Sequence, residues 1–143
     1  MSDVVFVDTN ILVYAHDRDA GSKREKAAHA LNRLWDERLG RLSAQVLQEF
    51  HVTVTRKHST SSARASAREV VSMYAPWVQQ PTTPETILRA TELAELAQVS
   101  FWDALILASA EQAGAAQLYS EDLNYGQTIA GVKICKSAND RVS

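Results

Sequence analysis

The pattern of apolar and polar positions divides the chain into short strands and longer helices. Residues 4–7 are four consecutive apolar residues, three of them valines, which is typical of a strand buried on both faces of a sheet. Shorter apolar or alternating runs predict the other strands, at 40–43 (a strand or a turn), 77–79, 117–120 and 132–135. We therefore expect a sheet assembled from segments that are far apart in the sequence.

Apolar residues at intervals of three and four predict helices between these strands. In the second helix, Ala27, Leu31 and Leu34 share one face. The expected helices cover residues 10–19, 22–38, 44–57, 63–74, 85–97 and 101–113. Strands separated by helices favour a mostly parallel sheet with helices packed against it. The sequence thus predicts an α/β protein, and 143 residues fit one domain spanning 1–143.

The composition excludes several classes of protein. Cys135 is the only cysteine, which excludes an intrachain disulfide and the cysteine-rich zinc motifs. Its alternating surroundings predict an inert core thiol. No apolar segment comes near the roughly 20 residues that a membrane span needs, and no basic segment followed by an apolar one marks a secretory signal. We expect a cytoplasmic protein without a membrane contact.

The net charge of −2 conceals an asymmetry along the chain. Residues 50–68 contain no acid, whereas 85–122 contain seven acids against Arg89 alone. An anionic polymer held beside an acidic, metal-loaded pocket would suit this arrangement, and ordinary solvated helix faces would suit it as well. The candidate phosphate contacts to RNA are Arg56, Lys57, Arg64 and Arg68.

Two aspartates follow predicted strands. Asp8 comes directly after 4–7, and Asp122 follows 117–120 with Glu121 between them. Because ligands bind at the carboxyl ends of strands in open α/β sheets, both are candidate site residues. The structural alternatives are that Asp8 or a neighbour caps the next helix and that 121–122 is a plain acidic loop.

Two more acids lie on predicted helices. Asp103 lies in 101–110, which is apolar on nearly every face, so its ionised carboxylate would need compensation. Backbone amides of the first helical turn or a buried ion pair would supply this without any site. Glu49 lies at the edge of the apolar stripe of helix 44–57, where most glutamates are simply solvated.

Convergence of these four acids would constrain the chemistry. Two carboxylates about 4 Å apart repel by roughly 4 kcal/mol at an effective dielectric constant of about 20, so four would need divalent cations to stay ionised. Oxygen-only ligands favour Mg²⁺ or Mn²⁺ over zinc. Such ions activate water and neutralise the charge that develops on a phosphate, which points to phosphodiester hydrolysis.

The sequence around these acids resembles a known family, the PIN-domain ribonucleases, and is most similar to the VapC-type toxins of bacterial toxin–antitoxin pairs. Each motif is short, but the four occur in the family's order and cover nearly the whole chain, from Val4 to about Cys135. The motifs are Asp8-Thr9-Asn10 after an apolar strand, Glu49 in Gln45-Val46-Leu47-Gln48-Glu49-Phe50, Phe101-Trp102-Asp103-Ala104, and Leu118-Tyr119-Ser120-Glu121-Asp122-Leu123.

The resemblance implies an α/β/α sandwich whose acids gather at one end of a parallel sheet. It implies that one or two Mg²⁺ or Mn²⁺ ions bind to Asp8, Glu49, Asp103 and Asp122, and that RNA is cleaved at a phosphodiester bond. Thr9 matches the family's hydroxyl residue beside the first acid, and Asn10 matches its pocket-organising asparagine. Such proteins commonly form homodimers, and an antitoxin covers the acidic pocket with its C-terminal segment.

One position departs from the family's pattern. Tyr125 stands in Asn124-Tyr125-Gly126-Gln127, where similar proteins often carry a charged or polar residue. This leaves open whether Tyr125, or Glu121 before it, contributes to the site beside Asp122. The four main acids are not affected.

Two other functions fit the sequence less well than that of a metal-dependent ribonuclease. A haloacid-dehalogenase-type phosphatase also begins with an aspartate after an apolar strand, but it needs a second aspartate two positions later, where this chain has Asn10. A non-catalytic RNA-binding PIN-like module is free to lose its acids, and all four are present here. We therefore predict a metal-dependent ribonuclease, and the toxin role follows from the resemblance alone.

Overall fold

A five-stranded sheet forms the centre of the molecule in a computed structural model, which describes residues 3–123 and 125–136. The strands lie in the order β2-β1-β3-β5-β4; the first four are parallel, and β4 runs antiparallel to β5. Their bounds are β1 (Val5–Val7), β2 (Gly40–Arg41), β3 (Gln117–Tyr119), β4 (Thr128–Ile129) and β5 (Val132–Cys135). The expected α/β fold with a mostly parallel sheet is confirmed.

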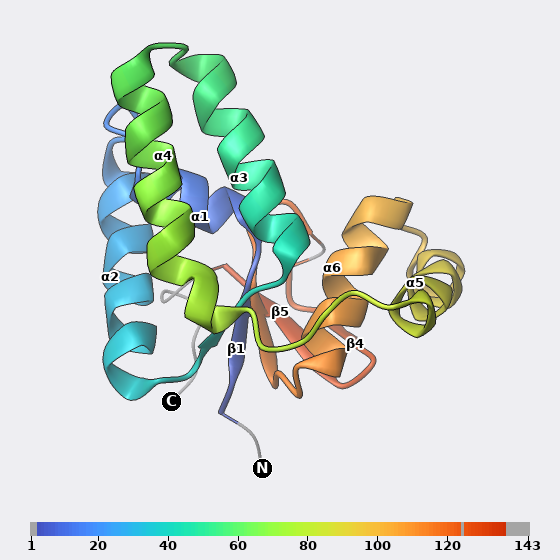
Figure 1. Cartoon of the computed structure of the whole chain (residues 1–143). Coiled ribbons are helices and arrows are strands. Elements are labelled where there is room, and N and C mark those ends of the chain that lie inside the picture. Colours follow the sequence, from blue (N-terminus) through green and yellow to red (C-terminus); the bar gives the residue numbers. More distant parts are fainter. Residues whose placement is uncertain (1–2, 124, 137–143) are drawn as a thin grey trace.

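Helices cover the sheet on both sides and extend beyond it. Figure 1 shows α2 on one side and α5 and α6 on the other, while α3 and α4 form a long hairpin that projects away from the strands. The helices are α1 (Thr9–Ala15), α2 (Ser22–Glu37), α3 (Ala44–Lys57), α4 (Ser61–Tyr74), the 3₁₀ helix η1 (Ala75–Trp77), α5 (Pro84–Ala97) and α6 (Phe101–Gln112). All six predicted α-helices are therefore present, with α3 matching at both ends.

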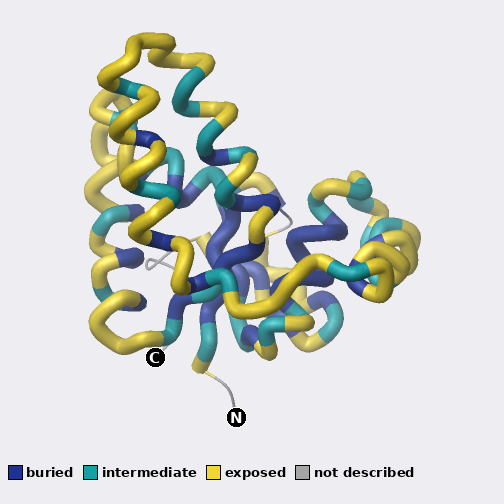
Figure 2. Tube along the Cα trace, viewed as in Figure 1, coloured by how far each residue is buried: buried dark blue, intermediate teal, exposed yellow. Residues whose placement is uncertain are grey.

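The core lies where the sheet meets α6 and the inner faces of the other helices. All three residues of β1 are buried, as its uninterrupted apolar run predicted. Along α6, every residue from Ala104 to Ala110 is buried, because this helix packs against the sheet on one side and α5 on the other. Figure 2 shows the dark, buried segments in the middle of the fold. Cys135 lies among them, as expected of a core thiol.

Two predicted elements differ from the structure, and one strand was missed. The strand at 77–79 is wrong: Pro76 lies within the 3₁₀ helix η1, and only Val78 forms an isolated parallel bridge, to Leu42. The first helix ends at Ala15 rather than at residue 19, because the side chain of Asp17 accepts a hydrogen bond from the Asp19 amide and forms a turn. The two-residue strand β4 was not predicted.

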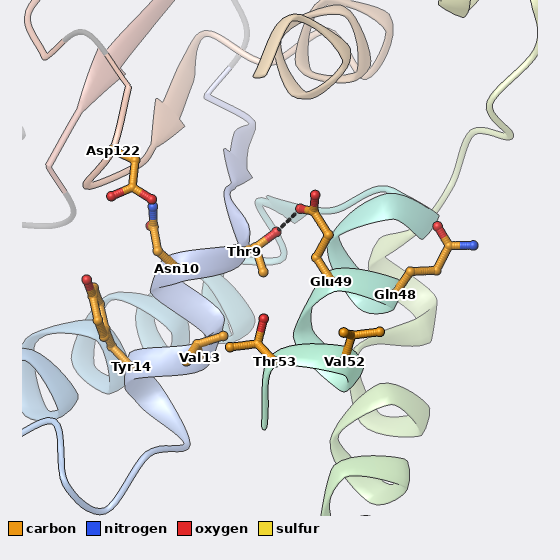
Figure 3. A pocket seen from close by; sticks show the side chains of 9 residues that line it. All are labelled: Thr9, Asn10, Val13, Tyr14, Gln48, Glu49, Val52, Thr53 and Asp122. Carbon is orange, nitrogen blue, oxygen red and sulfur yellow. Dashed lines mark hydrogen bonds between the residues drawn. The ribbon is translucent and has the colours of Figure 1, made fainter. Parts of the chain in front are cut away.

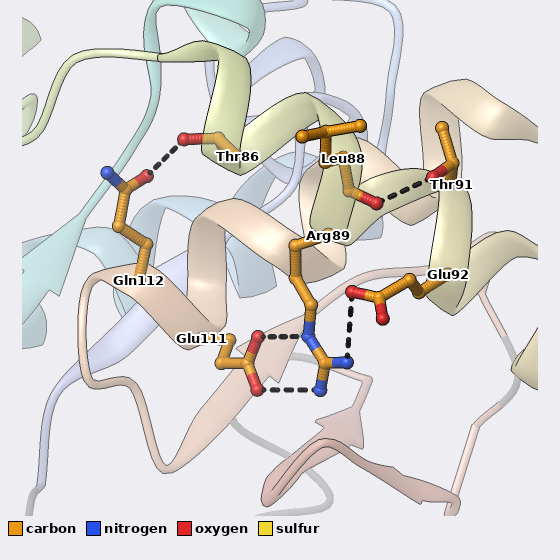
Figure 4. Close-up of polar contacts among 7 residues, drawn as sticks. All are labelled: Thr86, Leu88, Arg89, Thr91, Glu92, Glu111 and Gln112. Carbon is orange, nitrogen blue, oxygen red and sulfur yellow. Dashed lines mark hydrogen bonds and ion pairs between the residues drawn. The ribbon is translucent and has the colours of Figure 1, made fainter.

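Helix α5 sits at the periphery and is fastened to α6 by polar contacts (Figure 4). The guanidinium of Arg89 donates two hydrogen bonds to Glu111, at 2.8 and 3.0 Å, and Thr86 donates to Gln112 at 3.3 Å. Within the described residues, no single helix is long and apolar enough to cross a membrane; α5 and α6 pass that test only as a pair, which bends by 115°.

Candidate active site

Asp8 lies at the carboxyl end of the central strand β1. Its backbone amide donates to Tyr119 O at 2.9 Å, which extends the pairing of β1 with β3 by one residue. The next residue starts α1, and Asp8 is its N-cap, with Oδ1 accepting a hydrogen bond from the Thr9 amide at 2.7 Å. The carboxyl is thus held in place, and only 7% of the residue is exposed. Asp8 therefore caps α1, which was the structural alternative to a site role, and its geometry is compatible with a site role as well.

Ser120 connects Asp8 to the loop that carries Asp122. Its fully buried hydroxyl donates to Asp8 Oδ2 at 2.7 Å. The same oxygen accepts hydrogen bonds from the amides of Asp122 and Leu123, both at 3.2 Å. The turn that follows β3 is therefore fixed relative to Asp8, while the Asp122 side chain is exposed. No separate signal in the sequence pattern indicated Ser120, which ends the predicted strand 117–120 and lies within the motif that contains Asp122.

Glu49 faces the same end of the sheet from α3. Its Oε1 accepts a hydrogen bond from the Thr9 hydroxyl at 2.7 Å, and its Oε2 accepts one from Gln45 Nε2 at 3.3 Å. The Gln45 amide also donates to Trp102 O in α6 at 3.2 Å. Gln45 therefore links Glu49 to α6, the helix that carries Asp103. The sequence pattern did not indicate this contribution of Gln45.

Asp103 lies in the first turn of α6, three residues after the N-cap Ser100, whose hydroxyl accepts a hydrogen bond from the Asp103 amide at 3.1 Å. The residue is half-buried rather than enclosed, so the expectation of a deeply buried carboxylate fits Asp8 better than Asp103. Asn10 acts on the adjacent loop, since its Oδ1 accepts a hydrogen bond from the Glu121 amide at 3.2 Å.

Burial and neighbouring carboxyls raise the pKa values of Asp8 and Asp103. Burial is the main cause that raises the pKa of Asp8 to about 6, aided by the charges of Asp103 and Glu49 and opposed by the hydrogen bonds from Ser120 and Thr9. Burial also raises the pKa of Asp103, with further contributions from Asp122 and Glu49 and an opposing one from Ser100. No cationic side chain contributes to either pKa. The structure thus brings the four acids close enough for Asp8 to be affected by Asp103 and Glu49, and Asp103 by Asp122 and Glu49, and no cation among the described residues offsets these charges at Asp8 or Asp103.

A cleft of about 550 Å³ opens beside these carboxyls, between α1 and α3 (Figure 3). Among the described residues that line it are two acids, Glu49 and Asp122, and no basic residue. The full lining consists of Thr9, Asn10, Val13, Tyr14, Gln48, Glu49, Val52, Thr53 and Asp122. The donor set consists of carboxylate, amide and hydroxyl oxygens, which fits Mg²⁺ or Mn²⁺.

The PIN domain family model matches residues 5–128 of this chain. The chain belongs to the PIN domain family. The matched segment contains all four acids, from Asp8 to Asp122, and every residue that lines the cleft. The resemblance stated from the motifs is thereby confirmed at the level of the family. The sequence has no significant match among curated proteins.

Solved PIN domain structures share the fold at low sequence identity. VapC20 from Mycobacterium tuberculosis, described as a sarcin–ricin loop cleaving toxin, is 22% identical with a TM-score of 0.63, covering 82% of this chain and 89% of that one. A toxin–antitoxin complex from Klebsiella pneumoniae is 23% identical (TM-score 0.64, 90% and 94%). FitAcB from Neisseria gonorrhoeae is 16% identical (TM-score 0.65, 93% and 97%).

A second acidic group of this PIN domain lies away from the cleft. Among the described residues, one set of three ligand-type side chains, Asp17, Asp19 and His58, has its ligand atoms all within 4.8 Å of one another. Lys57 Nζ already lies 2.7 Å from Asp17 Oδ2 and 3.9 Å from Asp19 Oδ2. The four carboxyls at the cleft are spread more widely, so a shared ion there requires rotation of their accessible members, Asp103 and Asp122.

The basic residues predicted to contact RNA lie elsewhere on the PIN domain. They belong to the last turn of α3 and to α4, in the hairpin that Figure 1 shows projecting from the sheet. Lys57 is paired with Asp17, and Arg64 donates to Ser59 O at 2.9 Å. None of the four, Arg56, Lys57, Arg64 and Arg68, lines the cleft, and their role in RNA binding stays a prediction.

Proposed function

We propose that this PIN domain is a Mg²⁺- or Mn²⁺-dependent endoribonuclease. The observation that carries the proposal is the group of mutually repelling carboxyls at the carboxyl edge of the sheet, beside an open cleft without a basic residue. Unbalanced negative charge of this kind is stabilised by a divalent ion, and perturbed carboxyls in a cleft are typical of functional sites. Family membership supports the same conclusion.

Each residue has a distinct part in the proposed site. Asp8, Glu49, Asp103 and Asp122 would hold the ion, which when bound supplies charge neutralisation at the phosphodiester and lowers the pKa of water. Thr9 orients Glu49 through its 2.7 Å hydrogen bond. Asn10 and Ser120 hold the loop that carries Asp122. Asp8 is the most deeply buried of the proposed ligands, and both of its oxygens accept hydrogen bonds, at 2.7 Å each.

We infer further that the chain is the toxin of a toxin–antitoxin pair and acts in the cytoplasm. The support is its fold, which it shares with VapC20 and with solved toxin–antitoxin complexes. Co-purification with the small protein encoded beside it, and loss of RNA cleavage in that complex, would test the antitoxin. The homodimer stays a prediction, and Leu88→Glu and Leu96→Glu on the exposed face of α5 would test it by sedimentation.

The decisive experiment measures cleavage of internally linked RNA with and without Mg²⁺ or Mn²⁺. We expect Asp8→Asn and Asp103→Asn to lose at least about 100-fold in rate, because loss of one ion ligand removes several kcal/mol of transition-state stabilisation. Asp17→Asn is the matched control, an aspartate outside the cleft, and should retain full activity.

Other outcomes would contradict the proposal. Unchanged metal-dependent cleavage by Asp8→Asn or Asp103→Asn would remove that residue from the site. Release of phosphate from small monoesters without cleavage of RNA would identify a phosphatase instead. Retention of RNA at its original length, with the ions present, would identify a binding module.

A further inference from the structure

We propose that the groove between α1 and α3 binds one base of the RNA substrate and that the Thr53 hydroxyl recognises the edge of that base. The inference rests on the proposed ribonuclease function and extends it to substrate selection. It concerns the part of the cleft that lies beyond the carboxyls, whose walls are Val13, Tyr14, Val52 and Thr53.

The groove has the lining that a flat, uncharged group requires. Figure 3 shows Val13 on α1 pointing toward Thr53 on α3, with Glu49 and Thr9 at one end and Val52 farther along the lining, next to Gln48. Val52 keeps 46% of its surface exposed although it lies beside the proposed reaction centre. Exposed apolar side chains next to a reaction centre are typical of surfaces that contact substrate.

Charge decides which part of a nucleotide enters this groove. Beyond the carboxyls, the described walls of the groove carry no charged side chain, so nothing there compensates the charge of a phosphate. A base carries no charge at neutral pH and presents apolar faces with polar edges. With the scissile phosphate at the carboxyls, the attached nucleotide therefore places its base, rather than its next phosphate, between α1 and α3.

Lys23 lies beside the groove, where it can contact the next phosphate of the RNA strand. Lys23 Nζ lies 4.9 Å from the centre of the Tyr14 ring, and that ring lines the groove. A lysine beside an otherwise acidic cleft suits the backbone of a single strand, since phosphate contacts position the strand while base contacts select it.

Thr53 differs from two other threonines on helices in its hydrogen bonding. Thr55 Oγ1 donates to His51 O at 2.7 Å, and Thr91 Oγ1 donates to Leu88 O at 2.6 Å, so both hydroxyls bond to their own helix. Among the described residues, the hydroxyl of Thr53 has no such partner. In Figure 3 it points toward the end of the groove where Thr9 meets Glu49. This hydroxyl is free to donate to, or accept from, the edge of a base.

The test is a comparison of base preference in the wild type and in Thr53→Val, which keeps the shape of the side chain and removes its hydroxyl. Short RNAs with each of the four bases at each position around the cleavage site are cleaved in Mg²⁺. We expect the ratio of best to worst base at one position to fall about 10-fold, the worth of one hydrogen bond in discrimination. Thr91→Val, an exposed threonine on α5 (Figure 4), should keep the wild-type ratio.

A binding measurement separates failure of this inference from failure of the proposed function. Wild-type protein in Mg²⁺ is titrated with AMP, CMP, GMP and UMP, and amide shifts of Val13, Val52 and Thr53 are followed by NMR. Groove shifts with one base favoured, in a protein that cleaves no RNA, would reject the nuclease and leave the base site standing. RNA cleavage without any base preference and without groove shifts would overturn the base site. Groove shifts with a basic peptide but with no nucleotide would overturn it in favour of a protein partner.

Discussion

Two groups of acids in this molecule have opposite electrostatic environments. Asp17 and Asp19 lie in the loop after α1 and face Lys57, whose hydrogen bond is the main cause that lowers the pKa of Asp17. Asp8 lies some ten residues earlier, at the end of β1, where burial and the neighbouring charges raise its pKa to about 6. The same side chain is thus stabilised as an anion in one place and destabilised in the other.

The difference shows what marks a site. The Asp17 group has the tighter geometry for a cation, but Lys57, whose side chain is 47% exposed, already supplies the positive charge there. The cleft has the looser geometry, and none of the described residues that line it is a cation. Unbalanced charge, rather than the closeness of acidic groups, therefore indicates where an external ion is needed.

The largest expected effect is a dependence of stability on pH without metal. Folded Asp8 keeps its proton up to about pH 6, whereas the unfolded chain loses it near the ordinary aspartate pKa of 3.8. The folded state binds more protons between these values, so the free energy of unfolding should fall by about 3 kcal/mol as pH rises from about 3 to about 7. Urea unfolding with EDTA measures this, and Asp8→Asn should lack most of the slope. An equal slope in that variant would place its origin elsewhere.

Binding of Mn²⁺ should restore the stability that the metal-free protein loses as pH rises. An ion that binds only the folded state at 100 times its dissociation constant adds about 2.7 kcal/mol of stability. At pH 7 the thermal midpoint of the wild type should rise with Mn²⁺ or Mg²⁺, and Asp17→Asn should rise equally. Asp8→Asn should not respond. If instead Asp17→Asn alone lost the response, the ion would bind at the loop after α1.

Removal of the Ser120 hydroxyl should have the next largest effect. Ser120→Ala takes a donor from Asp8 and leaves two loop amides without their acceptor, at a cost of about 2 kcal/mol. Ser43→Ala is the matched control, because the Ser43 hydroxyl is equally buried and makes no hydrogen bond in the described structure. Denaturant unfolding at pH 7 compares the two, and equal costs would contradict the linking role of Ser120.

The smallest effect on stability should come from loss of the ion pair between Asp17 and Lys57. Asp17→Asn removes one partner of an ion pair whose lysine is half-exposed and therefore screened by solvent, and such partly exposed pairs contribute little to stability. Its unfolding midpoint should stay close to that of the wild type, and the difference should shrink further in 0.5 M NaCl. A salt-independent loss would show that the loop after α1 depends on Asp17 for more than charge.

Much of the fold was predictable because its signals are local. The unbroken apolar run of β1 and the apolar stripe of α3 each identify an element without reference to the rest of the chain. The 3₁₀ helix at Trp77 was not predictable in this way. Its indole packs over Gly40, where a Cβ atom would lie 2.4 Å from the ring, and this contact joins residues 37 positions apart. The short β4 exists only through its pairing with β5.

For the candidate site, the sequence indicated the acids but not their connections. Asp8 and Asp122 stood out because each follows a predicted strand, and Asp103 because its helix is apolar. Ser120 and Gln45 carry no such signal, since serine and glutamine occur on most surfaces. Their importance depends on three-dimensional contacts, with Asp8 for one and with Glu49 and Trp102 for the other.

The saturated hydrogen bonding of Ser120 also limits the course of any reaction at this edge of the sheet. Its single proton is given to Asp8, both of its lone pairs are engaged by backbone amides, and none of its surface is exposed. Such a hydroxyl cannot attack phosphorus, so no covalent seryl intermediate forms at Ser120. Any nucleophile that acts at this edge of the sheet must therefore be a group other than Ser120.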